Sequence, residues 1–304
     1  MADLSVSLGK LRLSNPVLVA SGTFGYGEDY QDLVSLKRLG ALVTKTITLK
    51  KREGNPAPRI VETYQGMLNS IGLENPGFKG FVETQLPFMR KIGIPVIVSI
   101  SADKAVQFAR LARALSRTAG VAAIELNISC PNLGKKGLIA QDARSVYKVV
   151  KATRRATKLP IITKLSPNVT DIGAIAKAAG KGGSDIISLV NTYFAMAVDV
   201  QTRTPKLGSI SGGLSGPAIK PQALWMVRQA YKAVKIPIIG MGGIMNAQDA
   251  LEFIVCGASA IAVGTATFVD PQSATKIIAG IESYLEEKRI PNLKKVIGSL
   301  KDGK

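Results

Sequence analysis

Short runs of apolar residues alternate with longer amphipathic segments along most of the chain. Within each run the apolar residues are consecutive rather than alternating, which is typical of parallel strands buried on both faces. The runs predict eight strands, at residues 17–20, 41–46, 95–100, 122–127, 160–165, 186–191, 236–240 and 260–264.

Helical periodicity marks the segments between these runs, and several segments begin at a capping residue. The predicted helices 104–117, 143–157, 172–181 and 247–255 follow Asp103, Asp142, Asp171 and Asn246, and a last long helix follows Asp270 and Pro271. Gly40, Gly120 and Gly257 stand after helices, where we expect the left-handed conformation of a C-cap.

Repeated alternation of strand and helix predicts an α/β fold, a TIM (β/α)8 barrel formed by residues 1–304 as a single domain. A doubly wound sheet is the alternative, but no G-x-G-x-x-G turn follows the first strand and no linker divides the chain. Two connections, 47–78 and 192–220, are too long for ordinary βα loops. Segments of this kind are usually active-site lids or disordered.

Composition narrows the chemistry of the chain. Hydrophobic residues make up 46% and charged residues 20%, as in a globular protein with a sizeable core. The chain has no histidine, which excludes a Ser-His-Asp triad and histidine metal ligands. Its two cysteines are too few for a zinc cage or a disulfide framework, so we expect no bound metal and a reducing, cytoplasmic location. No targeting signal or membrane-spanning stretch is visible.

The formal net charge of +19 has two interpretations, a solvated basic surface and a surface that binds nucleic acid. The basic clusters are short, carry no interleaved aromatic residues and match no nucleic-acid-binding motif. We therefore expect no nucleic-acid partner.

Polar side chains stand at the carboxyl ends of the predicted strands, where TIM barrels hold their active sites. Lys45 and Lys164 end apolar strands. Because a lysine is rarely buried without a partner, its presence there indicates an anionic ligand. Asn127 and Asn191 offer both a donor and an acceptor, which suits an amide or imide ligand. Glycines after the last two strands, Gly242, Gly243 and Gly264, allow backbone N–H groups to approach a phosphate.

The two thiols differ in their surroundings. Cys130 follows the fourth strand in a loop beside Pro131, where we expect a reactive thiol. Cys256 ends an apolar helical stretch and is predicted to belong to the core.

Three blocks resemble the class 1 dihydroorotate dehydrogenase family: 20–25 (ASGTFG), 69–77 (NSIGLENPG) and 127–132 (NISCPN). The likeness runs from Leu4 to about Tyr284 with the blocks in the family's order. The stretch 54–70 is most similar to class 1B, the NAD-linked catalytic subunits.

This resemblance implies oxidation of (S)-dihydroorotate to orotate in pyrimidine (UMP) biosynthesis, with one FMN per chain. Cys130 is then the base that takes a proton from C5 while hydride leaves C6 for the flavin. The resemblance also implies a homodimer joined to a second subunit that carries FAD and a 2Fe–2S cluster and passes electrons to NAD⁺. Two cysteines cannot ligate such a cluster, which needs about four.

The family's motifs also imply which residues bind cofactor and substrate. FMN is expected at Ser21, Lys45, Thr46, Ser99, Asn127, Lys164, Val190, Gly216, Gly242, Gly243, Gly264 and Thr265. Dihydroorotate is expected at Lys45, Asn69, Ser70, Ile71, Gly72, Leu73, Asn127, Asn191 and Thr192. Ser99 departs from the pattern, because many relatives have asparagine facing the flavin there.

Two enzymatic alternatives remain open at this point. Within the family, a class 1A homodimer would use fumarate as acceptor. Outside it, Lys164 could form the Schiff base of a TIM-barrel aldolase. A yellow flavin colour distinguishes a dehydrogenase from an aldolase.

Overall fold

A closed barrel of eight parallel strands forms the centre of the computed structural model, which describes residues 2–129 and 139–301. Its strands are β3 (Val17–Val19), β4 (Ala41–Val43), β7 (Val96–Ile100), β8 (Ala123–Asn127), β9 (Ile161–Lys164), β10 (Ile186–Leu189), β15 (Ile238–Gly240) and β16 (Ala260–Val263). They pair in the order β10-β15-β16-β3-β4-β7-β8-β9. The predicted TIM barrel is confirmed, and closure excludes an open doubly wound sheet.

Every residue of these eight strands is buried. One face of each strand packs inside the barrel and the other packs under helices, so both faces need apolar side chains. This two-sided burial explains why the runs do not alternate. The observed strands are up to three residues shorter than predicted, as β4 shows by ending at Val43 rather than Thr46.

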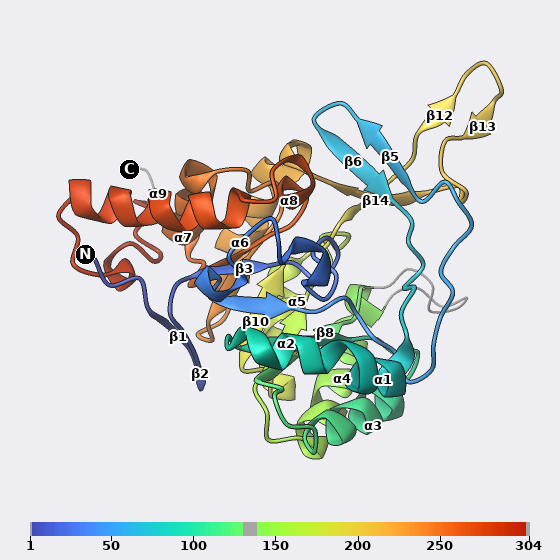
Figure 1. The fold of residues 1–304 in the computed structure, drawn as a ribbon, viewed down its shortest axis with the longest axis horizontal. Coiled ribbons are helices and arrows are strands. Elements are labelled where there is room, and N and C mark those ends of the chain that lie inside the picture. Colours follow the sequence, from blue (N-terminus) through green and yellow to red (C-terminus); the bar gives the residue numbers. More distant parts are fainter. Residues whose placement is uncertain (1, 130–138, 302–304) are drawn as a thin grey trace.

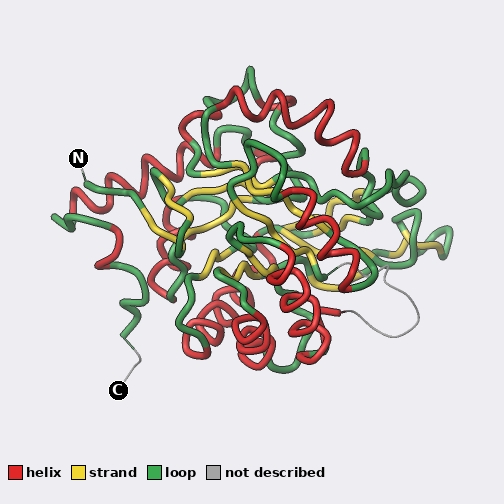
Figure 2. Tube along the Cα trace, turned by 90° about the horizontal axis from the view of Figure 1, so that it is seen from below, coloured by secondary structure: helices red, strands yellow, loops and turns green. Residues whose placement is uncertain are grey.

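Helices surround the barrel, as Figure 2 shows for the red segments outside the yellow strands. They are α1 (Gly77–Gly80), α2 (Leu86–Ile92), α3 (Ala105–Leu115), α4 (Ala143–Ala156), α5 (Ile172–Gly182), α6 (Lys220–Ala233), α7 (Ala247–Cys256), α8 (Ala266–Val269) and α9 (Ser273–Glu287). No helix in the described part of the chain is long and apolar enough to cross a membrane.

Helix starts follow the predicted capping residues with two exceptions. The last long helix, α9, begins at Ser273 with Gln272 as its N-cap residue, rather than directly after Asp270 and Pro271. The side chains of Asp142, Asp171 and Asn246 accept hydrogen bonds from backbone N–H groups three residues ahead. Asp103 was wrongly predicted as a cap: Lys104 is the N-cap residue of α3, and the Gln107 side chain accepts from both backbone N–H groups.

The glycines that follow helices are needed for two different structural reasons. Gly120 and Gly257 adopt φ angles of +85° and +120°. Gly257 is the C-cap of α7 as predicted, whereas α3 ends earlier with Ser116 as its C-cap, so Gly120 was wrongly predicted as a C-cap. The prediction was also wrong for Gly40, whose φ is not left-handed. A side chain there would collide with the backbone carbonyl of Asn15, so close packing excludes a Cβ at this position.

The two long connections both contain strands, and these strands meet over one end of the barrel. The 47–78 connection contains β5 (Ile60–Thr63) and β6 (Gly66–Asn69), and the 192–220 connection contains β11 (Tyr193–Ala195) and β14 (Gly212–Ser215). They form an antiparallel sheet in the order β11-β14-β6-β5, called the lid sheet below. Beyond it, β12 (Val198–Asp199) and β13 (Thr204–Pro205) project as a hairpin at the upper right of Figure 1.

A separate hairpin of β1 (Val6–Leu8) and β2 (Leu11–Leu13) precedes the barrel and lies away from the lid sheet (Figure 1). The alternating burial of its residues, buried-exposed-buried in both strands, is that of a ribbon with one face on the core. This hairpin therefore takes no part in covering the end of the barrel that lies under the lid sheet.

Candidate active site

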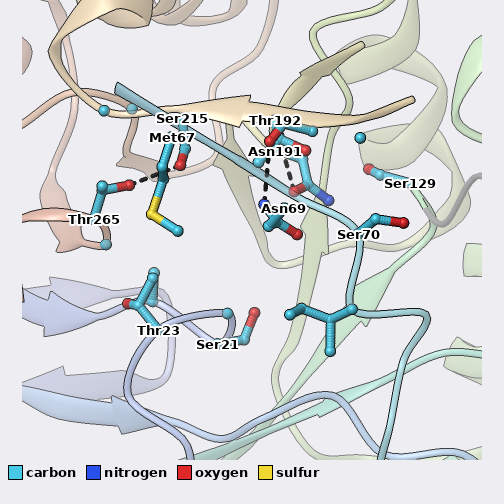
Figure 3. A pocket seen from close by; sticks show the side chains of 18 of the residues that line it. Ser21, Thr23, Met67, Asn69, Ser70, Ser129, Asn191, Thr192, Ser215 and Thr265 are labelled. Carbon is cyan, nitrogen blue, oxygen red and sulfur yellow. Dashed lines mark hydrogen bonds between the residues drawn. The ribbon is translucent and has the colours of Figure 1, made fainter. Parts of the chain in front are cut away.

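A cavity of about 470 Å³ lies between the carboxyl ends of the barrel strands and the lid sheet. This volume lies within the range of small-molecule sites, roughly 300–1,000 Å³. Figure 3 shows Ser21, from the turn after β3, across the cavity from Met67 and Asn69 of β6. The cavity thus has a floor made by the barrel and a roof made by the lid.

Nearly all residues singled out from the sequence line this one cavity. They are Ser21, Lys45, Thr46, Asn69, Ser70, Ile71, Gly72, Leu73, Asn127, Lys164, Val190, Asn191, Thr192, Gly216, Gly242, Gly243, Gly264 and Thr265. These residues come from seven barrel strand ends and both long connections, so the fold brings distant segments together.

Ser99 is the one described residue of the predicted site that does not line the cavity. It is fully buried beneath the cavity floor, and its expected contact with flavin stays a prediction. There its hydroxyl lies 3.0 Å from Thr46 Oγ1 and 3.2 Å from Glu125 Oε1. Cys130 lies outside the described residues, whereas its neighbour Ser129 lines the cavity.

Several lining residues were missed by the sequence reasoning. Thr265 donates to Ser215 Oγ at 2.8 Å, tying the end of β16 to lid strand β14 (Figure 3). Asn168 donates to the carbonyl of Thr192 and accepts from the N–H of Phe194, which fastens β11 to the barrel. The only sequence signal for Ser215 was its location in a glycine-rich connection, and Asn168, in the loop between β9 and α5, had none.

Two cations face the cavity without a protein counter-ion. Lys164, at the end of β9, is 6% exposed, and its Nζ lies 3.5 Å from the hydroxyl of Ser21. Among the described residues, neither Lys164 nor Lys45 forms an ion pair. A buried ammonium without a partner is costly, so these lysines favour an anionic ligand in the cavity.

Side-chain amides form the middle of the floor. Asn127, paired in register with Lys164, donates from Nδ2 to Thr46 Oγ1 at 3.1 Å. Asn191 donates from Nδ2 to Asn127 Oδ1 at 3.4 Å and accepts from the N–H of Thr192. Amide donors and acceptors side by side suit a ligand that carries its own amide or imide groups.

Glycine-rich turns close the far corner, after β15 and β16. Gly242 and Gly243 have φ angles of +122° and +78°. Among the described residues, the backbone N–H groups of Gly243, Gly264 and Thr265 have no acceptor, although all three residues line the cavity. Helix α7 begins shortly after these glycines, at Ala247, and the start of a helix carries a partial positive charge. Unpaired N–H groups at a helix start form a site for a phosphate.

Comparison with known proteins decides the family. The sequence model of a family described as dihydroorotate dehydrogenase matches residues 3–285. The chain belongs to the dihydroorotate dehydrogenase family.

Curated relatives of this dehydrogenase family match over nearly their whole length. A protein of Desulforamulus reducens is 52% identical over 98% of both chains, and one of Geobacter sulfurreducens is 51% identical over 98% of both. Each is named dihydroorotate dehydrogenase B (NAD(+)), catalytic subunit. A third, from Geotalea uraniireducens, carries the same name at 49% identity.

Membership of the dihydroorotate dehydrogenase family makes this protein an oxidoreductase of a flavin-dependent family. The aldolase alternative for Lys164 is therefore set aside, as is a primary role in nucleic-acid binding. The donors present fit a flavin nucleotide: unpaired N–H groups for a phosphate at one end, and a buried cation and amides for a polar ring at the other.

Proposed function

We propose that this chain is the FMN-binding catalytic subunit of an NAD-linked dihydroorotate dehydrogenase, acting as a single domain in the cytoplasm. The observation that carries the proposal is the convergence of the two unpaired lysines and the two asparagines in one cavity beneath the lid sheet. The names of the relatives, all NAD(+)-linked catalytic subunits, support the acceptor.

Substrate recognition follows from the chemistry of dihydroorotate, which has a carboxylate and a cyclic imide. We assign the carboxylate to Lys45 and the imide edge to the amides of Asn127 and Asn191. Residues 69–73 and Thr192 cover the substrate from the lid side. Oxidation removes one proton from C5 and one hydride from C6, so a base and a hydride acceptor must stand on the ring.

We assign the base to Cys130. This assignment rests on the sequence block 127–132 and on the neighbouring residue Ser129, which is buried and lines the cavity. The backbone nitrogen of Ser129 lies 3.4 Å from Asn127 Oδ1. The residue that precedes Cys130 in the sequence therefore contacts one of the amides assigned to the substrate.

FMN, when bound, supplies the ring that accepts the hydride. The glycine-rich corner, with Gly216 and Thr265, is assigned to its phosphate, and Ser21, Thr46 and Val190 to its ring. The ammonium of Lys164 stabilises negative charge that develops on the cofactor side of the cavity.

The phosphate assignment predicts that two glycine substitutions affect different properties: Gly243→Ala lowers the free energy of unfolding, and Gly264→Ala lowers the affinity for FMN. Gly243→Ala places a Cβ 2.9 Å from the carbonyl oxygen of Gly216 at a left-handed φ, so it is expected to lower the free energy of unfolding by about 1–3 kcal/mol. Gly264→Ala meets no protein atom closer than 3.7 Å. It is expected to leave the free energy of unfolding unchanged yet weaken FMN binding, because its methyl group projects into the cavity.

Urea unfolding of the apoprotein and FMN titration measure the two effects separately. Full FMN affinity in Gly264→Ala would place the phosphate elsewhere.

A partner subunit is needed for the NAD-linked reaction. The cavity rim carries apolar side chains that line the cavity while remaining about half or more exposed: Ile60, Phe194, Ile210 and Phe268. Such a patch is typical of a protein interface. We propose that a homodimer of this chain joins an FAD and iron–sulfur subunit, which passes electrons to NAD⁺.

The chain purified alone is therefore expected to be yellow and to reduce an artificial dye with dihydroorotate, but not NAD⁺. The physical reason is that the one cavity described here is filled by FMN and substrate, which leaves no assigned place for NAD⁺. Assays with dihydroorotate and NAD⁺, fumarate or a dye test this. Efficient NADH formation by the chain alone would contradict the two-subunit proposal, and efficient fumarate reduction would indicate class 1A.

A further inference from the structure

A buried carboxyl group lies below the cavity floor and is not used by the chemistry proposed above. Glu125, in the middle of β8, is 1% exposed and does not line the cavity. Its two oxygens accept hydrogen bonds from Ser99 Oγ of β7 at 3.2 Å and from Ser188 Oγ of β10 at 3.1 Å. Since β9 separates β8 from β10, the side chain of Glu125 reaches across the barrel interior.

One of these two contacts continues to the substrate amides. Ser99 Oγ lies 3.0 Å from Thr46 Oγ1, and Thr46 Oγ1 accepts from Asn127 Nδ2 at 3.1 Å. Asn127 Oδ1 in turn accepts from Asn191 Nδ2. The described contacts of the Ser188 hydroxyl end at Glu125, so the carboxylate has one connected branch and one terminal branch.

The donors and acceptors along the connected branch are fixed in one direction. A carboxylate only accepts hydrogen bonds, so the single hydroxyl proton of Ser99 is committed to Glu125. Ser99 can then only accept from Thr46, which commits the proton of Thr46. Thr46 is left with lone pairs alone for its next neighbour. That neighbour must present N–H groups, so Asn127 directs its NH₂ toward Thr46.

We propose that Glu125 is a positioning residue for dihydroorotate: through Ser99 and Thr46 it holds the amide of Asn127 in one of its two orientations. This inference rests on the proposed function, in which Asn127 and Asn191 match the donors and acceptors of the imide. A reversed Asn127 would set its carbonyl oxygen against the lone pairs of Thr46 and its NH₂ against the NH₂ of Asn191. The buried carboxyl group thereby selects which atoms the cavity floor offers.

Two serine substitutions form a matched test, because both remove a fully buried hydroxyl from the same carboxylate. Ser99→Ala cuts the connected branch and Ser188→Ala cuts the terminal one. In the FMN-loaded chain, Ser99→Ala is expected to lower kcat/KM for dihydroorotate with a dye acceptor by about 10- to 100-fold and to weaken orotate binding. Ser188→Ala is expected to keep wild-type kcat/KM and orotate affinity. Its loss of thermal stability is expected to be similar to that of Ser99→Ala.

Equal losses of kcat/KM in the two variants, or no loss in either, would overturn the proposal, because a purely structural carboxylate does not distinguish its two partners. Glu125→Met supplies a second measurement: it removes both acceptor oxygens, so the hydroxyl proton of Ser99 is no longer committed and kcat/KM should fall. In the double variant with Ser99→Ala the loss should be no larger than with Ser99→Ala alone. Additive losses would also overturn it.

The wild-type chain separates this inference from the proposed function. If the FMN-loaded wild type is not reduced by dihydroorotate, the proposed function fails. If the wild type is reduced and Ser99→Ala matches it, the positioning role alone fails.

Discussion

Replacing Cys130 with alanine is expected to slow reduction of the bound flavin by dihydroorotate by at least about 100-fold, the low end for a lost general base. FMN should stay bound, because none of the residues assigned to the cofactor changes. Anaerobic stopped-flow measurement of flavin bleaching gives the rate directly, and the flavin spectrum gives the cofactor content.

Cys256→Ala is the matched control, since it removes the other thiol of the chain. Cys256 ends α7, away from the cavity lining, and burial raises the pKa of its thiol. It is therefore a poor source of thiolate, and its loss should leave flavin reduction at the wild-type rate. A Cys130→Ala enzyme that is reduced as fast as this control would refute the assignment of the base.

Lys164→Met is expected to have opposite effects on the empty and the loaded protein. In the apoprotein the buried ammonium has one contact among the described residues, the Ser21 hydroxyl at 3.5 Å, so an apolar chain of similar length should keep or raise Tm. Bound FMN loses its cation, and we expect either loss of FMN or a lower flavin reduction potential.

Lys220→Met is the comparison, because Lys220 forms ion pairs with Asp249 at 2.6 Å and Glu252 at 3.0 Å. Removing that ammonium leaves two carboxylates without their partner and should lower the Tm of the apoprotein. Thermal scans of both apoproteins, with FMN content and a potentiometric titration, test the contrast. Full FMN content and an unchanged potential in Lys164→Met would show that this lysine does not serve the cofactor.

The barrel could be predicted from the sequence because its physical cause is local. Each strand is buried on both faces, and a run such as Val17–Val19 records that burial in consecutive residues. Polar residues at the ends of such runs, as with Lys164 and Asn127, then mark the functional end of the barrel. These predictions needed only the strands and the rule that their carboxyl ends meet.

The lid sheet could not be predicted, because its cause is not local. Strand β14 is Gly-Gly-Leu-Ser, which has little intrinsic preference for a strand, and β12 and β13 have two residues each. The pairing of β14 with β6 depends on the other connection, whereas β12 and β13 pair with each other within their own connection. The direction of a side chain could not be predicted either: Glu125 lies in the predicted strand 122–127, but its hydrogen bond to Ser188 across the barrel depends on the closed geometry.

The lid sheet also has a consequence for the order in which the molecule can assemble. Its central pairing joins β6 to β14, and Asn69 donates to the carbonyl of Gly213, 144 positions further along the chain. Contacts between such distant residues close large loops and form late in folding. During synthesis, the roof over the substrate must therefore wait until the chain has passed residue 215, when six of the eight barrel strands already exist. The strand that completes the roof is followed only by the two strands whose glycine turns are assigned to the phosphate, so substrate cover and cofactor corner mature together at the end of translation.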